Sequence, residues 1–264
     1  MNGTLTFLGT GTSMGVPTLG CDCPVCTSAD PRDRRLRPSV LIRWTEPENA
    51  ERVVVIDTGP DFREQALRQR LTRVDAVLYT HGHADHILGL DDLRPLSFKA
   101  LREGGPIPLY AAPDTEAILR KIYEYTFSPE STYKNRAKVA LVPLADRNTI
   151  HAVEFLRVPV RHGDLTIAGF RFGNIAYLTD VSAIPEESFA LLENLDHLVL
   201  SALRHKPHPN HATLEQALEW AQRIGARQTW FTHICHDLPH EETNRTLPEG
   251  IRLAHDGLTV PLTL

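Results

Sequence analysis

The sequence lacks the features that direct a chain to a membrane, to secretion or to nucleic acid. No window approaches the roughly 18 uninterrupted apolar residues of a membrane span. The N-terminus, MNGTLTFLGTGTSMGVP, has no basic segment followed by an apolar run, so we expect no signal peptide. The net charge of −5 argues against a large electrostatic footprint for DNA or RNA. No repeat, low-complexity tract or linker is visible, so we expect one domain over residues 1–264.

Cysteine is scarce and unevenly placed. Of the 4 cysteines, Cys21, Cys23 and Cys26 form one C-x-C-x2-C cluster, and only Cys235 lies elsewhere. This pattern does not resemble a disulfide framework spread through a secreted domain, so we expect a cytoplasmic protein. Three thiols at this spacing indicate a metal clip, for which tetrahedral zinc requires a fourth ligand. A reactive redox cluster is the competing interpretation.

Short apolar segments rich in β-branched or aromatic residues predict strands in both halves of the sequence. They cover residues 4–9, 39–44, 52–57, 75–80, 153–160, 165–172, 175–180, 196–202 and 227–233. Several run directly into polar clusters such as DTGPD and THGHADH. Strands that end in this way place polar groups along one edge of a sheet, where α/β proteins tend to keep their sites.

Two helices are predicted between these strands. Residues 113–125 carry an apolar face made of Ile118, Leu119, Ile122 and Tyr123. Residues 212–225 read as a second helix, with a capping box of Thr213 and Gln216 and a stop at Gly225. The overall pattern is two strand-rich halves interleaved with helices.

Histidine is abundant, with 13 in the chain, and several stand beside carboxylates. The densest group is THGHADH, which holds His81, His83, Asp85 and His86 directly after the strand predicted over 75–80. The side chains of His81 and His83 can point to one metal position. Asp85 and His86 follow a turn, and their side chains can point to a second metal position about 3.5–4 Å from the first. So many ionisable groups after a buried strand would be costly without a shared ligand. Imidazole and carboxylate suit Zn²⁺, Mn²⁺ or Fe²⁺.

Further ligands are available at or just past other predicted strand ends: His162, Asp180 and His233. Taken singly, each is equally well read as a structural histidine or a turn aspartate. Taken with THGHADH, they supply the additional groups that a two-metal site needs.

An H-x-H-x-D-H motif after a strand, followed by a lone histidine, an aspartate and a final histidine, resembles the metallo-β-lactamase superfamily. The resemblance implies a four-layer αββα sandwich with the site at one edge of its two sheets. It assigns one metal to His81, His83 and His162 and the other to Asp85, His86 and His233, with Asp180 bridging two divalent ions, Zn or Mn. Asp57, in IDTGPD, matches an earlier acidic motif and is expected to orient a metal-bound histidine rather than to bind metal itself.

The segment Asn210-His211-Ala212-Thr213 resembles the H-x-T motif of the phosphodiesterase branch, which includes ribonuclease Z. That resemblance places His211, as general acid, and Asp85 in catalysis by a hydroxide held between two metals. The alternative is an exposed histidine before a helix cap. GTGTSMGVP, the cysteine cluster, THGHADH and FTHICHD resemble the phosphoribosyl 1,2-cyclic phosphate phosphodiesterases of bacterial phosphonate breakdown. A small or cyclic phosphodiester is therefore the expected substrate.

In that family a histidine three positions after the last metal ligand completes a structural zinc site. The resemblance thus gives one structural zinc bound by Cys21, Cys23, Cys26 and His236, and Cys235 is the alternative fourth ligand. With all four positions filled by protein, such a site has no place for a reacting water, so it is expected to be a brace. The nearby basic run, Arg32, Arg34, Arg35 and Arg37, is read as a solvated face, with a phosphate contact as the alternative.

Four other functions share parts of these patterns. They are a thioesterase of the glyoxalase II kind, a tRNA 3′-processing nuclease, a pyrroloquinoline quinone biosynthesis protein, and a non-catalytic protein of the same fold. The H-x-T motif and the cysteine cluster favour the small phosphodiesterases, and no counterpart of the long tRNA-gripping arm is visible. We expect no membrane partner and no extended nucleic acid, and the sequence is compatible with a homodimer.

Overall fold

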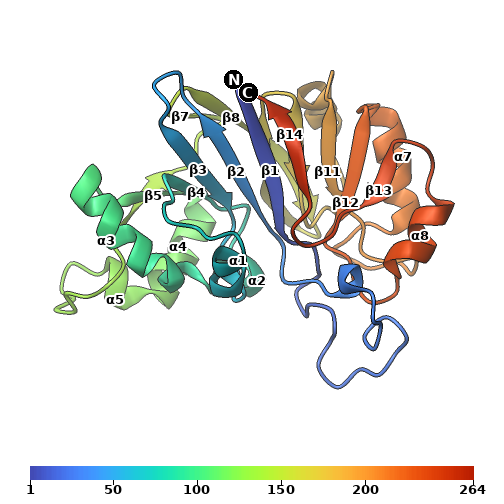
Figure 1. The fold of residues 1–264 in the computed structure, drawn as a ribbon, viewed down its shortest axis with the longest axis horizontal. Coiled ribbons are helices and arrows are strands. Elements are labelled where there is room, and N and C mark those ends of the chain that lie inside the picture. Colours follow the sequence, from blue (N-terminus) through green and yellow to red (C-terminus); the bar gives the residue numbers. More distant parts are fainter.

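Two seven-stranded sheets face each other in the computed structural model, which describes residues 1–264 (Figure 1). The first sheet has the order β14-β1-β2-β3-β4-β5-β6. Its strands are β1 (Asn2–Gly9), β2 (Ser39–Thr45), β3 (Glu51–Ile56), β4 (Ala76–Leu78), β5 (Ile107–Ala111), β6 (Val139–Pro143) and β14 (Thr259–Thr263). Strands β3 to β6 run parallel, so their carboxyl ends lie at one edge.

The second sheet has the order β13-β12-β11-β10-β9-β8-β7. Its strands are β7 (Arg147–Ile150), β8 (Val153–His162), β9 (Leu165–Phe172), β10 (Ile175–Leu178), β11 (His197–Ser201), β12 (Gln228–Thr232) and β13 (Ile251–Leu253). Strands β10 to β13 are parallel to one another. A buried apolar layer that includes Phe7 and Ile42 from one sheet and Phe155 and Phe170 from the other joins the two.

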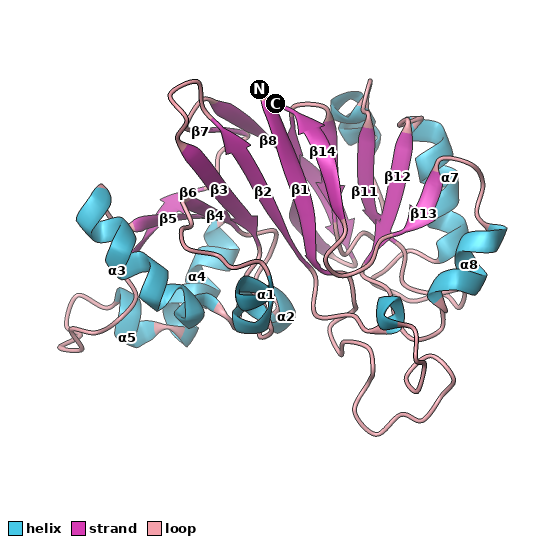
Figure 2. Cartoon of the chain, viewed as in Figure 1, coloured by secondary structure: helices cyan, strands magenta, loops and turns pink.

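Helices cover the outer face of each sheet (Figure 2). Against the first sheet lie α1 (Phe62–Arg68), α2 (Ala84–Ile87), α3 (Arg94–Glu103), α4 (Pro113–Ile122) and α5 (Glu124–Phe127). With the second lie α6 (Glu186–Phe189), α7 (Leu214–Ile224) and α8 (His240–Thr246). Short 3₁₀ turns occupy Pro31–Asp33, Leu90–Leu93 and Ala190–Leu192. The expected αββα sandwich is confirmed.

The helix predicted over 212–225 is α7, and its ends follow the sequence signals. Thr213 Oγ1 accepts a hydrogen bond from Gln216 N, and the Gln216 side chain accepts one from Thr213 N. Gly225 ends the helix at a φ of 68°, a conformation that glycine adopts without strain. The capping box therefore sets the start of this helix directly after the H-x-T segment.

The helix predicted over 113–125 differs from expectation in two ways. It is broken at Tyr123 into α4 and α5. Of its predicted apolar face, Leu119 and Tyr123 are buried, whereas Ile118 and Ile122 are 38% and 44% exposed. Only half of the predicted apolar face therefore packs against the rest of the protein.

Several strands end earlier than predicted, and the difference has a backbone cause. Asp57, Asp180 and His233 were expected as the last residues of strands, but those strands end at Ile56, Leu178 and Thr232. The three residues instead take positive φ values of 64°, 57° and 56°. Positive φ outside glycine is costly and is concentrated at functional sites, where the surrounding structure holds it.

A long loop between β1 and β2 folds below the sheets (Figure 1). Thr12 N donates to Ile234 O over 3.0 Å and Ile234 N donates to Thr10 O over 2.9 Å, which ties the loop beside His233. The expected solvated basic face is wrong for Arg35, whose buried guanidinium donates to Thr10 Oγ1 and to Ala254 O. None of the helices combines the length and apolarity that a membrane span requires.

Candidate metal centre

The first group of candidate ligands joins two strand ends. His81 and His83 follow β4, and His162 is the last residue of β8 in the other sheet. One ligand atom from each lies within 4.8 Å of the others. Their ring centroids are 4.5 Å apart for His81 and His83 and 5.0 Å apart for His83 and His162. The structure therefore assembles the three histidines at one edge of the sandwich.

The second group consists of Asp85, His86, Asp180 and His233, all buried. His86 Nε2 lies 3.2 Å from Oδ2 of Asp85 and 3.2 Å from Oδ2 of Asp180. His233 Nε2 lies 3.0 Å from Oδ1 of Asp180. Asp180 thus presents its two oxygens to two different histidines, and its carboxylate also falls in a group with His162 and His211.

The unpartnered nitrogens of these groups fit divalent cations. Nε2 of His81, of His86 and of His233 is buried without a hydrogen bond, although carboxylate oxygens stand close to two of them. Buried polar atoms are otherwise almost always paired. Two nitrogen or oxygen ligands of one tetrahedral zinc are about 3.3 Å apart. The separations of 3.0–3.2 Å between His and Asp atoms are close to that value.

The opposite ring nitrogens are held by hydrogen bonds that fix which nitrogen faces the site. His86 Nδ1 donates to Asp57 Oδ2 over 2.7 Å. Thr80 N and Oγ1 donate to the same carboxylate, and Thr80 Oγ1 accepts from His81 Nδ1 over 3.0 Å. The buried Asp57 therefore orients His86 directly and His81 through Thr80. This role of Thr80 was missed by the sequence analysis, and its only signal is the place of Thr80 between the strand and His81.

His162 is held in the same manner from the other sheet. Its Nδ1 lies 2.8 Å from Asp180 O and 2.9 Å from Asn210 O, so this nitrogen carries the proton and Nε2 is left free. Carbonyl and carboxylate partners of this kind raise the basicity of a metal-binding imidazole.

Electrostatics favour the ligand form of Asp180 and His81. The carboxylates of Asp85 and Asp180 act oppositely on His86 and His233, whose pKa values they raise despite burial, so a metal ion would displace a proton from each of these two rings. Burial opposes ionisation of Asp180, but His233 and His86 outweigh it and hold the pKa of that carboxyl well below its usual value. Burial lowers the pKa of His81 well below its usual value, with His86 adding to the effect. At neutral pH the aspartate is therefore anionic and His81 is neutral.

His211 lies between the two groups. Its ring centroid is 4.7 Å from that of His233 and 4.8 Å from that of His162, and its Nδ1 is 3.8 Å from Asp180 Oδ1. That Nδ1 is buried without a hydrogen bond. Burial, helped by His233, lowers the pKa of His211 to about 3, so the imidazole is neutral in the free chain.

The cysteine cluster meets His236 and leaves Cys235 aside. His236 Nδ1 lies 3.2, 3.3 and 3.4 Å from Sγ of Cys21, Cys23 and Cys26. A tetrahedral zinc with ordinary bond lengths would set each of these separations at about 3.6 Å. Cys235 Sγ instead accepts a hydrogen bond from Asp237 N over 3.4 Å. The arrangement fits a zinc ion and shows no disulfide.

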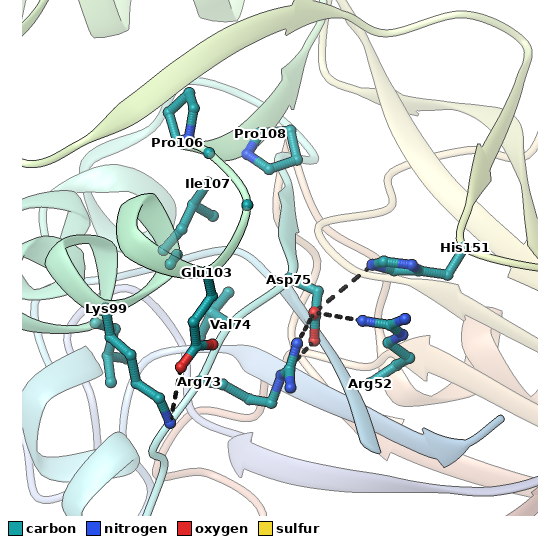
Figure 3. Close-up of a pocket in the computed structure, with 14 residues that line it drawn as sticks. Arg52, Arg73, Val74, Asp75, Lys99, Glu103, Pro106, Ile107, Pro108 and His151 are labelled. Carbon is teal, nitrogen blue, oxygen red and sulfur yellow. Dashed lines mark hydrogen bonds and ion pairs between the residues drawn. The ribbon is translucent and has the colours of Figure 1, made fainter. Parts of the chain in front are cut away.

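A separate hollow lies at the other end of the first sheet (Figure 3). Arg52, Asp75 and Ile107 line it from the amino-terminal ends of the parallel strands, whereas the histidines follow the carboxyl ends. Asp75 is paired there with Arg73 and Arg52 and accepts a hydrogen bond from Val53 N. These groups satisfy one another and take no part in the histidine site.

Comparison with known proteins decides the family. Residues 52–234 match the beta-lactamase superfamily domain. The chain belongs to the metallo-β-lactamase superfamily. Together with the histidine and carboxylate groups, this membership indicates a site for divalent cations.

Solved structures extend the likeness over the whole chain. A crystal structure described as a new diphosphatase from the PhnP family is 53% identical, covers 100% of this chain and 99% of its own, and superposes with a TM-score of 0.92. Zn²⁺-bound PqqB from Methylobacterium extorquens, 21% identical with a TM-score of 0.76, covers 97% of this chain and 99% of its own. The short form of human tRNase Z, 19% identical with a TM-score of 0.67, covers 99% and 100%. The last two show the fold alone.

Curated relatives are longer than the matched region. An octanoyltransferase of Porphyromonas gingivalis is 37% identical over 256 residues, which are 96% of this chain and 50% of that protein. Coenzyme PQQ synthesis protein B of Methylobacterium nodulans is 34% identical over 125 residues, or 44% of this chain and 38% of that protein. The chain spans about half, or less, of the length of these relatives.

Proposed function

We propose that this chain is a phosphodiesterase that binds two divalent metal ions, Zn²⁺ or Mn²⁺, and hydrolyses a small or cyclic phosphodiester. The observation that carries the proposal is the position of His211, which reaches both candidate ligand groups from the start of α7. A histidine in this position can donate a proton to the leaving oxygen of a phosphate ester as the ester bond breaks. The likeness to a diphosphatase of the PhnP family supports the same substrate chemistry.

His81, His83 and His162 would hold one ion, and Asp85, His86 and His233 the other, with Asp180 between them. Bound there, divalent cations would lower the pKa of water and stabilise negative charge on the phosphoryl oxygens. Asp57 and Thr80 keep the protons of His86 and His81 on Nδ1, so that Nε2 stays available. These hydrogen bonds are present before the substrate binds, so the histidines need no reorientation during the reaction.

His211 is the proposed general acid, and its protonation depends on the substrate. In the free chain burial keeps the pKa of His211 at about 3, so the ring is neutral and lacks the second, acidic proton that a general acid donates. A phosphodiester anion beside the ring would favour the imidazolium form by Coulomb attraction. The proton would then pass from His211 to the leaving oxygen as the phosphorus–oxygen bond breaks. Asp85, whose carboxyl pKa lies well below its usual value despite burial, is expected to remain ionised throughout.

The cysteine cluster is proposed to hold a structural zinc with His236 as its fourth ligand. His236 comes three residues after His233, and Ile234 between them pairs with the long N-terminal loop. A zinc ion here would fasten that loop to the segment that carries His233. Four protein ligands leave no open position for a reacting water.

The test is hydrolysis by the metal-reconstituted protein of a substrate panel. It contains bis(4-nitrophenyl) phosphate, cyclic nucleotides, a ribose cyclic phosphate, an RNA with a 3′-trailer and a glutathione thioester. We expect metal-dependent turnover of the small phosphodiesters and slow or no processing of the RNA. Turnover of the thioester alone, or of nothing in the panel, would overturn the proposal.

A second candidate, hydrolysis of an acyl thioester, is favoured by one observation. A relative 37% identical to this chain is named an octanoyltransferase, although the chain spans only half of it. An octanoyl thioester added to the panel tests this candidate. The placement of His211 gives it no support, since a thiolate is a good leaving group without a proton.

A further inference from the structure

His233 differs from the other buried ligand histidines in how its ring is held. Nδ1 of His81, of His86 and of His162 each meets an oxygen partner. Nδ1 of His233 is buried without a hydrogen bond, and its ring stacks on that of His211, with centroids 4.7 Å apart and planes inclined by 20°. No hydrogen bond of the side chain therefore fixes the direction of its Nε2, which depends on packing and on the backbone.

The backbone of His233 has a conformation that needs support from its surroundings. Its φ is 56°, a left-handed value that is costly outside glycine and persists only where neighbouring groups hold it. The peptides on both sides are held. Thr232 O accepts from Ala202 N over 3.0 Å, and Ile234 N donates to Thr10 O over 2.9 Å. The first of these bonds comes from the segment after β11, and the second comes from the start of the loop after β1.

Thr10 is itself held by three hydrogen bonds. Its N and its Oγ1 donate to Asp256 Oδ1 over 2.9 and 2.8 Å, and its Oγ1 accepts from Arg35 Nη1 over 2.9 Å. Thr10 is fully buried, and the side chain of Asp256 is only 7% exposed. A shift of Thr10 would move its carbonyl oxygen away from Ile234 N and turn the peptide that orients the His233 side chain.

We propose that Thr10 is a positioning residue for His233, and that its hydroxyl group determines how tightly the ion assigned to His233 is bound. Thr10 acts through the backbone of Ile234 and makes no hydrogen bond to a ligand side chain. The inference rests on the proposed two-ion site. It predicts a local effect, because the ion assigned to Asp85, His86 and His233 depends on this support and the ion assigned to the three other histidines does not.

Titration of Zn²⁺ against a chromogenic chelator tests the inference, in protein that holds only the cysteine-bound zinc at the start. Thr10→Val keeps the branched shape of the side chain and removes its hydroxyl. We expect this variant to weaken one of the two binding steps by about tenfold, the step that His233→Ala weakens most, and to leave the other step unchanged. The Zn²⁺ concentration that gives half-maximal turnover of bis(4-nitrophenyl) phosphate should rise by a similar factor.

Matched variants separate positioning from a general loss of stability. Thr10→Ser restores the hydroxyl and should bind both ions as the wild type does. Thr6→Val removes another buried hydroxyl, on β1, which lies 2.9 Å from Thr259 Oγ1, and it should leave both binding steps unchanged. Thr10→Ala also lacks the hydroxyl and takes the place of the valine variant if circular dichroism shows that the valine variant does not fold.

A folded variant without the Thr10 hydroxyl that binds both ions as tightly as the wild type would overturn the inference. Equal weakening of both steps, or the same loss in Thr6→Val, would also overturn it, because either result indicates a general effect on the fold. Wild-type protein that binds fewer than two ions beyond the cysteine-bound zinc would overturn the proposed two-ion site and the inference with it. The binding steps are measured without substrate, so a failure of phosphodiester turnover is distinguished from a failure of the inference.

Discussion

Replacing Asp57 by asparagine tests how the protein prepares its histidines. Asparagine has the same shape and tolerates the positive φ of 64° at this position. Its oxygen can still accept from Thr80 N, but its NH₂ group would stand where Oδ2 now accepts from His86 Nδ1. The NH₂ group would donate to Nδ1, and the proton of His86 would move to Nε2, the atom that faces Asp85 and Asp180.

The expected loss of metal affinity follows from the position of that proton on Nε2. A protonated Nε2 cannot bind a metal, and loss of an outer carboxylate partner costs about 10–100-fold in metal affinity. This equals about 1.4–2.7 kcal/mol of binding free energy. The metal-free variant should stay folded, because burial already raises the pKa of the Asp57 carboxyl and the neutral amide avoids that desolvation cost.

The assay is competition for Zn²⁺ or Mn²⁺ against a chromogenic chelator, with circular dichroism as the check on folding. Turnover at saturating metal should recover in part, because the variant retains the other ligands. A folded Asp57→Asn protein that binds metal as tightly as the wild type would refute the orienting role of Asp57.

Three further substitutions test separate parts of the site. His236→Ala should abolish retention of the structural zinc, measured as metal content after dialysis, and an unchanged zinc content would show that His236 is not the fourth ligand. His211→Ala should lower kcat by about 10²–10⁴-fold for phosphodiesters with alkoxide leaving groups and far less for 4-nitrophenyl esters, and an equal loss for both would exclude its role as general acid. Arg35→Leu should lower the free energy of unfolding in urea by about 1–3 kcal/mol, because the buried Ala254 O and Thr10 Oγ1 lose the guanidinium that donates to both, and an unchanged free energy of unfolding would contradict that dependence.

The strands that carry the site could be predicted because apolar β-branched runs are strong local signals. The strand over 165–172 has the predicted bounds, and the capping box of α7 was visible in the sequence. The strand ends were harder, since Asp57, Asp180 and His233 leave the β region to aim their side chains inward. That backbone change is imposed by the contacts between the sheets and has no signature in the residues themselves.

The grouping of the ligands depended on the family resemblance more than on residue spacing. Nothing in the local sequence places His162, at the end of β8, beside His81 in the other sheet. Strands β5, β6, β7, β13 and β14 were missed because they are short or interrupted by proline. The burial of Arg35 was missed for a related reason, because its partners Thr10 and Ala254 lie far away in the chain.

We propose that this chain cleaves phosphodiesters with two divalent ions held by the histidine and aspartate groups. The most direct measurement is the turnover of bis(4-nitrophenyl) phosphate as metal is added back to protein from which a chelator has removed all but the cysteine-bound zinc. We expect no turnover without added metal and full turnover only after two equivalents per chain. Full turnover at one equivalent, or turnover that persists without added metal, would contradict it.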